Sequence, residues 1–178
     1  GVEAADALHD DPELAALLMV KRIQARERGM EFEVAVASRS DPQGGLRAGL
    51  IGEGDLVTIV GNLVDNAMEV GGVGTRIALS IDATPWGVAI AVEDDGPGVP
   101  EALRAHVFEV GVSTKERHGA DEDAPQGSQR GIGLALVRRI AERHRGTVAL
   151  DDSPALGGAR FTVVLPISRT AAVEETAR

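Results

Sequence analysis

The stretch Asp55–Val70 reads DLVTIVGNLVDNAMEV, and its pattern decides the fold of the chain. Its apolar residues recur at spacings of three and four, which predicts one face of an amphipathic helix: Leu56, Ile59, Val60, Leu63, Val64 and Ala67. We expect Asp55 to cap this helix and Gly71 to end it. Asn62 and Asn66 lie one turn apart beside the apolar face. Because Asn is a mediocre helix former, the pair is either ordinary solvated flank or a functional feature, and other motifs must decide between them.

The composition limits what the chain can be. With 178 residues, of which 43% are hydrophobic, it is long enough for one domain with a buried core. Aromatic residues are scarce, so Val, Leu, Ile and Ala must build that core. The 28 acidic and 18 basic residues give a net charge of -10, which argues against a nucleic-acid-binding surface. The lack of cysteine excludes disulfides and thiolate chemistry, and no apolar run approaches the ~20 residues of a membrane helix.

The pattern along the chain predicts an α+β domain. Helices are expected at 11–28, 55–70 and 131–145. Strands are expected at 32–36, 77–81, 88–92, 147–150 and 159–165, with one more short strand around 46–50. We therefore expect a two-layer α/β sandwich, in which a mixed, mostly antiparallel sheet of about five strands is covered on one face by about three helices. The core-facing side of the last helix is expected to hold Ile132, Leu136, Val137 and Ile140.

Two glycine-containing turns follow the helix with the Asn pair. Asp94–Gly98 (DDGPG) ends a predicted strand, and it is either a tight turn or a place where the backbone approaches a ligand beside an accepting carboxylate. Gly131–Gly133 (GIG) begins a predicted helix, and it is either a packing feature or a phosphate site at the positive end of the helix. Leu136 stands where a dinucleotide fingerprint needs a third glycine, and the sequence contains no Gly-x-x-x-x-Gly-Lys-Ser/Thr loop.

Four motifs thus follow one another in a fixed order. They are Asn62-x-x-x-Asn66, Asp94-x-Gly96-x-Gly98, Phe108 with Ser113-Thr114-Lys115, and Gly131-x-Gly133. Together they resemble the ATP-binding domain of sensor histidine kinases, within the GHKL superfamily (Bergerat fold) that also includes gyrase and MutL. The resemblance covers 11–166. It is strongest to the citrate/C4-dicarboxylate-type two-component sensor kinases, in the segments PELAALL (12–18), GNLVDNA (61–67) and RGIGLALV (130–137).

This resemblance implies a site for ATP and Mg²⁺. Asn66 would coordinate the Mg²⁺ that bridges the phosphates. Asn62 would bind the nucleotide in the position where ATP-hydrolysing relatives have a glutamate that activates water. Since an amide cannot accept that proton, a site of this kind would hold ATP for transfer. Asp94 would accept a hydrogen bond from the adenine amino group, with Gly96 and Gly98 shaping the turn beside the base.

The resemblance also implies a long mobile lid over the nucleotide, spanning 107–130. Phe108 would anchor the start of this lid on the core, and Lys115 would reach the phosphates as a catalytic residue together with Asn62. The segment that follows would bind the phosphates through backbone N–H groups and one cationic side chain: Arg130, Gly131, Ile132, Gly133 and Leu134. For Lys115, Arg130 and also Arg104, solvated surface is the alternative to a phosphate contact.

The family's phosphoacceptor histidine belongs to a dimerising helical hairpin, and this sequence has no match to it. His9, His106, His118 and His144 lie in no similar context, so we interpret them as surface or packing residues. The resemblance then divides the chain into a connection from that hairpin (1–10), the catalytic domain (11–166) and a flexible tail (167–178). We expect a cytoplasmic location, as part of a membrane-bound sensor, and a monomeric fragment.

The implied function is that of the catalytic domain of a protein-histidine kinase. It would transfer the γ-phosphate of ATP to a histidine on the hairpin, for relay to a response regulator, mainly by positioning and charge stabilisation. The alternative is a nucleotide-dependent switch or scaffold of the same fold with little transfer. A hydrolysing ATPase and an anti-sigma-type serine kinase are disfavoured, because relatives of both kinds favour a glutamate at the position of Asn62.

Overall fold

The computed structural model describes residues 11–38, 51–52, 54–84, 86–109 and 132–166. Within these ranges five strands form one sheet: β1 (Glu31–Ser38), β2 (Arg76–Thr84), β3 (Gly87–Asp94), β4 (Thr147–Asp152) and β5 (Ala159–Pro166). Their order is β1-β2-β3-β5-β4, with β1 and β2 parallel and every other neighbouring pair antiparallel. The mixed, mostly antiparallel sheet expected from the sequence is confirmed.

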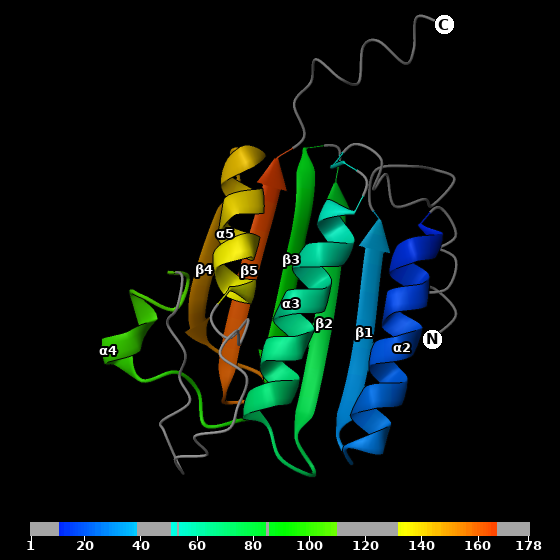
Figure 1. Ribbon diagram of the computed structural model, residues 1–178, viewed down its shortest axis with the longest axis vertical. Helices are drawn as coiled ribbons and strands as arrows, with labels where there is room; N and C mark the ends of the chain where they lie inside the picture. The colour runs from blue at the N-terminus through cyan, green and yellow to red at the C-terminus, as the bar shows by residue number, and fades with distance from the viewer. Residues whose placement is uncertain (1–10, 39–50, 53, 85, 110–131, 167–178) are drawn as a thin grey trace, which may run out of the picture.

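Three long helices cover one face of this sheet: α2 (Pro12–Glu27), α3 (Asp55–Val70) and α5 (Gly133–Arg143), as Figure 1 shows. A short helix, α4 (Glu101–Arg104), lies to the side of the sheet and was not expected from the sequence. Helix α3 connects the parallel strands β1 and β2, because a parallel pair needs a crossover rather than a tight turn. The result is the expected two-layer sandwich.

The core lies between the helices and the sheet. Alternate residues of β2 and β5 are buried, and the apolar face of α3 packs on them. Aliphatic side chains dominate this core, as the composition required, and Phe161 is the one aromatic residue among its fully buried members in the described ranges. The helix bounds of α3 match the expected 55–70, because an unbroken apolar stripe specifies a helix more strongly than any single cap.

Two details of the helices differ from the expectation. The N-cap of α3 is Gly54, with φ at 82°, and Asp55 is the first helical residue. Its carboxylate instead accepts a hydrogen bond from Arg143 and contacts His144 Nε2 at 2.7 Å, at the far end of α5. An acidic group in the first turn still interacts favourably with the helix dipole, but the tertiary partners of Asp55 decide where its carboxylate oxygens point.

The buried face of α5 is also rotated from the expected one. Val137 and Ile140 are buried as predicted, whereas Ile132 and Leu136 are 47% and 38% exposed. Ala135 and Ala141 take their places against the core. Small side chains let α5 approach its neighbours closely, and the sequence pattern alone gives no weight to alanine over leucine for this purpose.

Some expectations fall outside the described residues, namely the short strand around 46–50, most of the lid, and the two terminal segments. They stay predictions, as do the domain boundaries. Among the residues that the structure describes, no helix has the length and apolar character to cross a membrane.

Candidate functional site

Helix α3 lies between α2 and α5, and its two asparagines have different surroundings. The side-chain NH₂ of Asn62 donates to the Thr58 carbonyl at 2.7 Å. Its Oδ1 lies against the first residue of α5, because a Cβ at Gly133 would be only 2.5 Å from that oxygen. Asn66 is half-buried one turn further on, and no group in the described ranges bonds its amide. Asn62 is therefore fixed by the protein, whereas the Asn66 amide has no bonded partner among the described residues.

Asp94 is 1% exposed at the end of β3. Its Oδ1 accepts hydrogen bonds from the backbone N–H groups of Gly96 at 2.9 Å and Ala159 at 3.3 Å. Burial raises the pKa of Asp94, the two backbone hydrogen bonds lower it in part, and the charge of Asp95 raises it further. No described residue bonds Oδ2. The carboxylate is thus held rigidly by one oxygen, and the other can accept a hydrogen bond from a ligand.

The turn after Asp94 is packed against Gly158, which the sequence analysis did not single out. The Gly158 N–H donates to the Asp94 carbonyl at 3.0 Å. A Cβ at Gly158 would lie 2.5 Å from both the carbonyl and Oδ1 of Asp94, and 2.7 Å from the Gly96 nitrogen. Gly98 adopts φ of +71°, a conformation that favours glycine. The only sequence signal for Gly158 is the Gly157-Gly158 pair that precedes a predicted strand.

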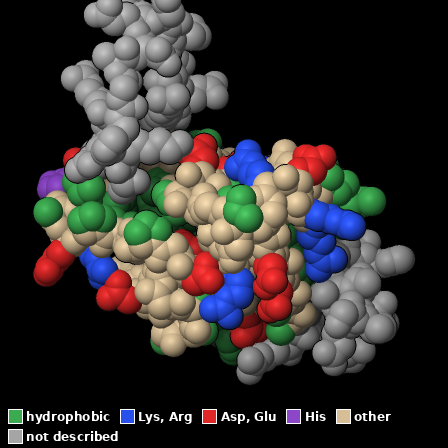
Figure 2. All heavy atoms as spheres, turned by 90° about the horizontal axis from the view of Figure 1, so that it is seen from below, with side chains coloured by type: hydrophobic (Ala, Val, Ile, Leu, Met, Phe, Trp, Pro, Cys, Tyr) green, Lys and Arg blue, Asp and Glu red, His purple; other side chains and the backbone are tan. Residues whose placement is uncertain are grey.

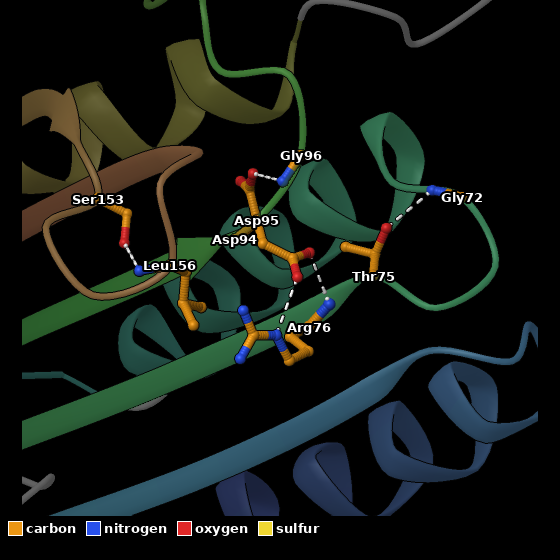
Figure 3. A network of polar contacts seen from close by, with 8 residues as sticks. All are labelled: Gly72, Thr75, Arg76, Asp94, Asp95, Gly96, Ser153 and Leu156. Carbon is orange, nitrogen blue, oxygen red and sulfur yellow. Dashed lines mark hydrogen bonds and ion pairs between the residues drawn. The ribbon is translucent and has the colours of Figure 1, made fainter.

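A second network holds the same turn from the other side (Figure 3). The Arg76 backbone N–H donates to Asp95 Oδ1 at 2.8 Å, and the Arg76 Nε–H donates to Asp95 Oδ2 at 2.9 Å. These hydrogen bonds lower the pKa of Asp95. Nearby, the Gly72 N–H donates to the Thr75 hydroxyl at 2.9 Å, where α3 turns into β2. Asp94 and Asp95 are adjacent in sequence, yet their side chains have different partners. The Asp94 carboxylate accepts from the Gly96 and Ala159 amides, whereas the Asp95 carboxylate bonds Arg76 at the start of β2.

The site residues are arranged along α3. Asn62, in the middle of α3, lies against Gly133, the start of α5. At the C-terminal end of α3, Val70 lies next to Gly96, since a Cβ at Gly96 would be 3.9 Å from Val70 Cγ2. Eight residues separate these two points, which is about 12 Å of helix at 1.5 Å per residue. Asn66 lies midway, between a carboxylate with a free oxygen and a helix N-terminus whose N-cap, Ile132, makes no side-chain capping hydrogen bond.

The start of the expected lid is packed as predicted. Val107 is buried, and the Phe108 ring meets the Phe161 ring edge-on with 6.0 Å between the centroids. Arg104 is used by the protein itself, because its Nε donates to the Val99 carbonyl at 2.9 Å and its guanidinium pairs with Asp152. Its side chain therefore ties the segment 99–104 to the end of β4.

Other expected site residues are placed only in part. Lys115, Arg130 and Gly131 lie outside the described residues. Ile132 is half-exposed, and Leu134 packs against the core. Of the four histidines, His106 pairs with Glu109 on the surface and His144 packs against Asp55, in agreement with the interpretation as surface and packing residues.

The charges around the site are mixed. Figure 2 views the molecule from below Figure 1, and acidic and basic side chains are interspersed on the described part of that face. In the described part of the chain no group of three or more His, Asp or Glu residues is arranged to hold a metal ion. A cation at this site would therefore rely on amide oxygens and on oxygens of the ligand itself.

Comparison with known proteins shows the family to which the chain belongs. Residues 52–169 match the family model described as histidine kinase-, DNA gyrase B-, and HSP90-like ATPase. The chain belongs to this family. Family membership implies that the chain binds ATP, and it is consistent with the open mixed sheet.

Two sensor proteins are among the curated relatives that match the chain. The sensor protein CitS of Halalkalibacterium halodurans is 34% identical over 163 residues, which is 88% of this chain and 27% of that protein. The sensor histidine kinase DpiB of Escherichia coli is 36% identical over 160 residues, again 88% of this chain and 27% of the relative. The chain thus spans about a quarter of the length of these relatives.

Solved structures of the family share the fold. The mycobacterial sensor histidine kinase MprB superposes with a TM-score of 0.62 at 26% identity, covering 86% of this chain and 93% of that chain. The ATP-binding domain of PrrB from Mycobacterium tuberculosis gives a TM-score of 0.56 at 29% identity, with 86% and 93% covered.

Proposed function

We propose that the chain is the ATP-binding catalytic domain of a two-component sensor histidine kinase. It binds Mg-ATP and transfers the γ-phosphate to a histidine on a separate dimerisation hairpin, for relay to a response regulator. The observation that carries this proposal is the arrangement along α3. The turn that holds the buried Asp94 carboxylate lies beside Val70, the uncapped start of α5 lies beside Asn62, and these two helix positions are about 12 Å apart along the axis. The carboxylate suits the adenine base, and the start of α5 suits the phosphates.

The adenine end of the site rests on Asp94. Its free Oδ2 accepts a hydrogen bond from the exocyclic amine of adenine, while Oδ1 stays bonded to the Gly96 and Ala159 amides. Gly158 and Gly96 leave room for this arrangement, because neither tolerates a Cβ without a contact under 3.0 Å to Asp94. An acceptor aimed at an amino group favours adenine over guanine, which has a carbonyl oxygen at the corresponding position.

The residues present also fit a magnesium ion. Mg²⁺ in nucleotide sites is held by one or two protein oxygens together with phosphates and water, and the unbonded amide of Asn66 offers one such oxygen. When bound, the ion neutralises charge on the phosphates. That contribution matters in a chain with a net charge of -10, which otherwise repels ATP.

Transfer rather than hydrolysis is supported by Asn62. An amide does not accept the proton of an attacking water, and the Asn62 NH₂ is already committed to the Thr58 carbonyl. The catalytic contribution of Asn62 is therefore to position the nucleotide. We assign the remaining phosphate contacts to the Gly133 and Leu134 amides at the start of α5 and, from the family pattern, to Lys115 and to the segment 130–131.

The test is transfer to the hairpin in trans. The chain is incubated with γ-labelled Mg-ATP and the separately expressed dimerisation hairpin of the full-length protein, and acid-labile label on the hairpin is measured. We expect labelling that depends on Mg²⁺ and is lost in Asn66→Ala. A domain that binds ATP tightly but labels no histidine would contradict the kinase assignment and favour the nucleotide-dependent switch.

A further inference from the structure

Helix α2 contacts α3 on the flank opposite α5, through two of its residues. The Leu17 methyl groups would lie 3.8 and 3.9 Å from a Cβ at Gly61, an ordinary van der Waals approach. The Lys21 ammonium donates to Asp65 Oδ1 at 2.6 Å, and it also reaches Gln24 Oε1 at 3.3 Å. Leu17 and Lys21 are one turn apart, so they form a single ridge on α2.

Lys21 is 7% exposed, and among the described residues only Lys21 and Asp94 are buried and ionisable. A buried ammonium is costly unless it is paired, and removal of its partner leaves the full cost in place. The aliphatic part of the Lys21 side chain is buried, and its ammonium group pairs with the half-exposed carboxylate of Asp65. This geometry ties the rotation of α3 to the position of α2.

The two points of contact stand in a fixed relation to the site. Gly61 and Asp65 each immediately precede one of the two site asparagines, Asn62 and Asn66. Successive helical residues differ by about 100° around the axis, so a ridge that fixes 61 and 65 on one flank also fixes where 62 and 66 point on the other. On that other flank Gly133 closes against Asn62.

We propose that Lys21 and Asp65 are positioning residues, which set the rotation of α3 so that the Asn66 oxygen meets the metal-bound triphosphate. The inference rests on the proposed function of the site. Neither side chain touches the nucleotide, and their effect is transmitted through α3. Displacements of about 1 Å at a reacting group are enough to change rates and affinities severalfold or more.

The experiment measures ATP affinity by calorimetry with and without Mg²⁺ for the wild type and for Lys21→Met, which keeps the aliphatic stem and removes the ammonium. We expect Lys21→Met to reduce the gain in ATP affinity that Mg²⁺ provides by about fivefold, and to change the ATP affinity without Mg²⁺ by less than about twofold. Lys21→Arg, which restores a cation, should recover most of the gain. Arg138→Met, which removes an exposed pair with Glu142, is the matched control and should match the wild type.

A double-mutant cycle adds a second readout. Because the two groups act as a pair, Lys21→Met combined with Asp65→Asn should lose no more Mg²⁺-dependent affinity than Lys21→Met alone. If Lys21→Met and Lys21→Arg melt at a lower temperature but keep the wild-type Mg²⁺ dependence, the pair is structural only and the inference is wrong. A wild type that binds no ATP contradicts the proposed function itself, which separates the two failures.

Discussion

Asp94→Asn tests the site most directly, because the structure predicts opposite effects on binding and on stability. The two backbone N–H groups that bond Oδ1 require an oxygen, so the asparagine carbonyl takes that place and its NH₂ takes the place of Oδ2. A donor then faces the adenine amine. A hydrogen bond to a charged group contributes about 1.5–3 kcal/mol, or roughly 10- to 150-fold in affinity. The donor-donor mismatch places the expected loss near the upper end, at about 100-fold.

The stability of the same variant should not fall. Burial raises the folded-state pKa of Asp94 above the ordinary 3.8, so the native protein binds this proton more tightly than the unfolded chain does. The associated stability is present below pH ~3.8 and is lost as the pH rises through the raised pKa. At neutral pH the wild type therefore carries an unfavourable buried charge that Asp94→Asn removes. We expect a melting temperature equal to or above that of the wild type near pH 7, and a smaller difference in acid.

The assay is calorimetric titration with ATP and with GTP, alongside thermal melts. Asp95→Asn is the matched control, since the Asp95 side chain bonds Arg76 and faces away from the site, and its ATP affinity should stay within about threefold of the wild type. The asparagine NH₂ at position 94 can donate to the guanine carbonyl, so the preference for ATP over GTP should shrink. If Asp94→Asn folds normally and binds ATP within about threefold of the wild type, the assignment of Asp94 to the base is wrong.

Three further predictions follow from the contacts. Gly158→Ala should weaken ATP binding by about tenfold or more, because the added Cβ would lie 2.5 Å from the Asp94 carbonyl oxygen. Gly72→Ala is the control: a Cβ there meets open space, so the affinity measured by calorimetry should not change. Burial raises the pKa of Asp55, but the hydrogen bonds from His144 and Arg143 outweigh it and lower the pKa overall. Asp55→Asn should therefore be less stable than the wild type in urea at pH ~5, and this difference in stability should vanish as the pH falls below 3.8. Phe108→Ala should lower the free energy of unfolding in urea by about 2 kcal/mol, which is less than the loss expected for truncating a fully buried Phe, and Phe108→Leu should lower it by under about 1.5 kcal/mol. If both variants are as stable as the wild type, the packing of Phe108 as an anchor is refuted.

The sequence by itself predicted the three long helices and the five strands of the sheet, and it proposed Asn66 as the metal ligand. The stripe from Leu56 to Ala67 specified α3, and its bounds agree with the structure because periodic burial over four turns outweighs local propensity. The order of the four motifs indicated the family, and the resemblance proposed Asp94 and Asn66 for the site. These features are local: each depends on a few neighbouring residues and on the geometry of a helix or a strand.

Only the tertiary structure decided what surrounds them. Gly158 closes on Asp94 from 64 residues further along the chain, as the contact between the two shows. Lys21 follows Leu14, Leu17 and Leu18 at helical spacing in the sequence, but its partner Asp65 is set only by the packing of α2 on α3. Asp55 was expected to cap its own helix, but it bonds the end of α5. The reason is the same in each case: which polar group meets which partner depends on how elements distant in the sequence pack, and no local periodicity records that packing.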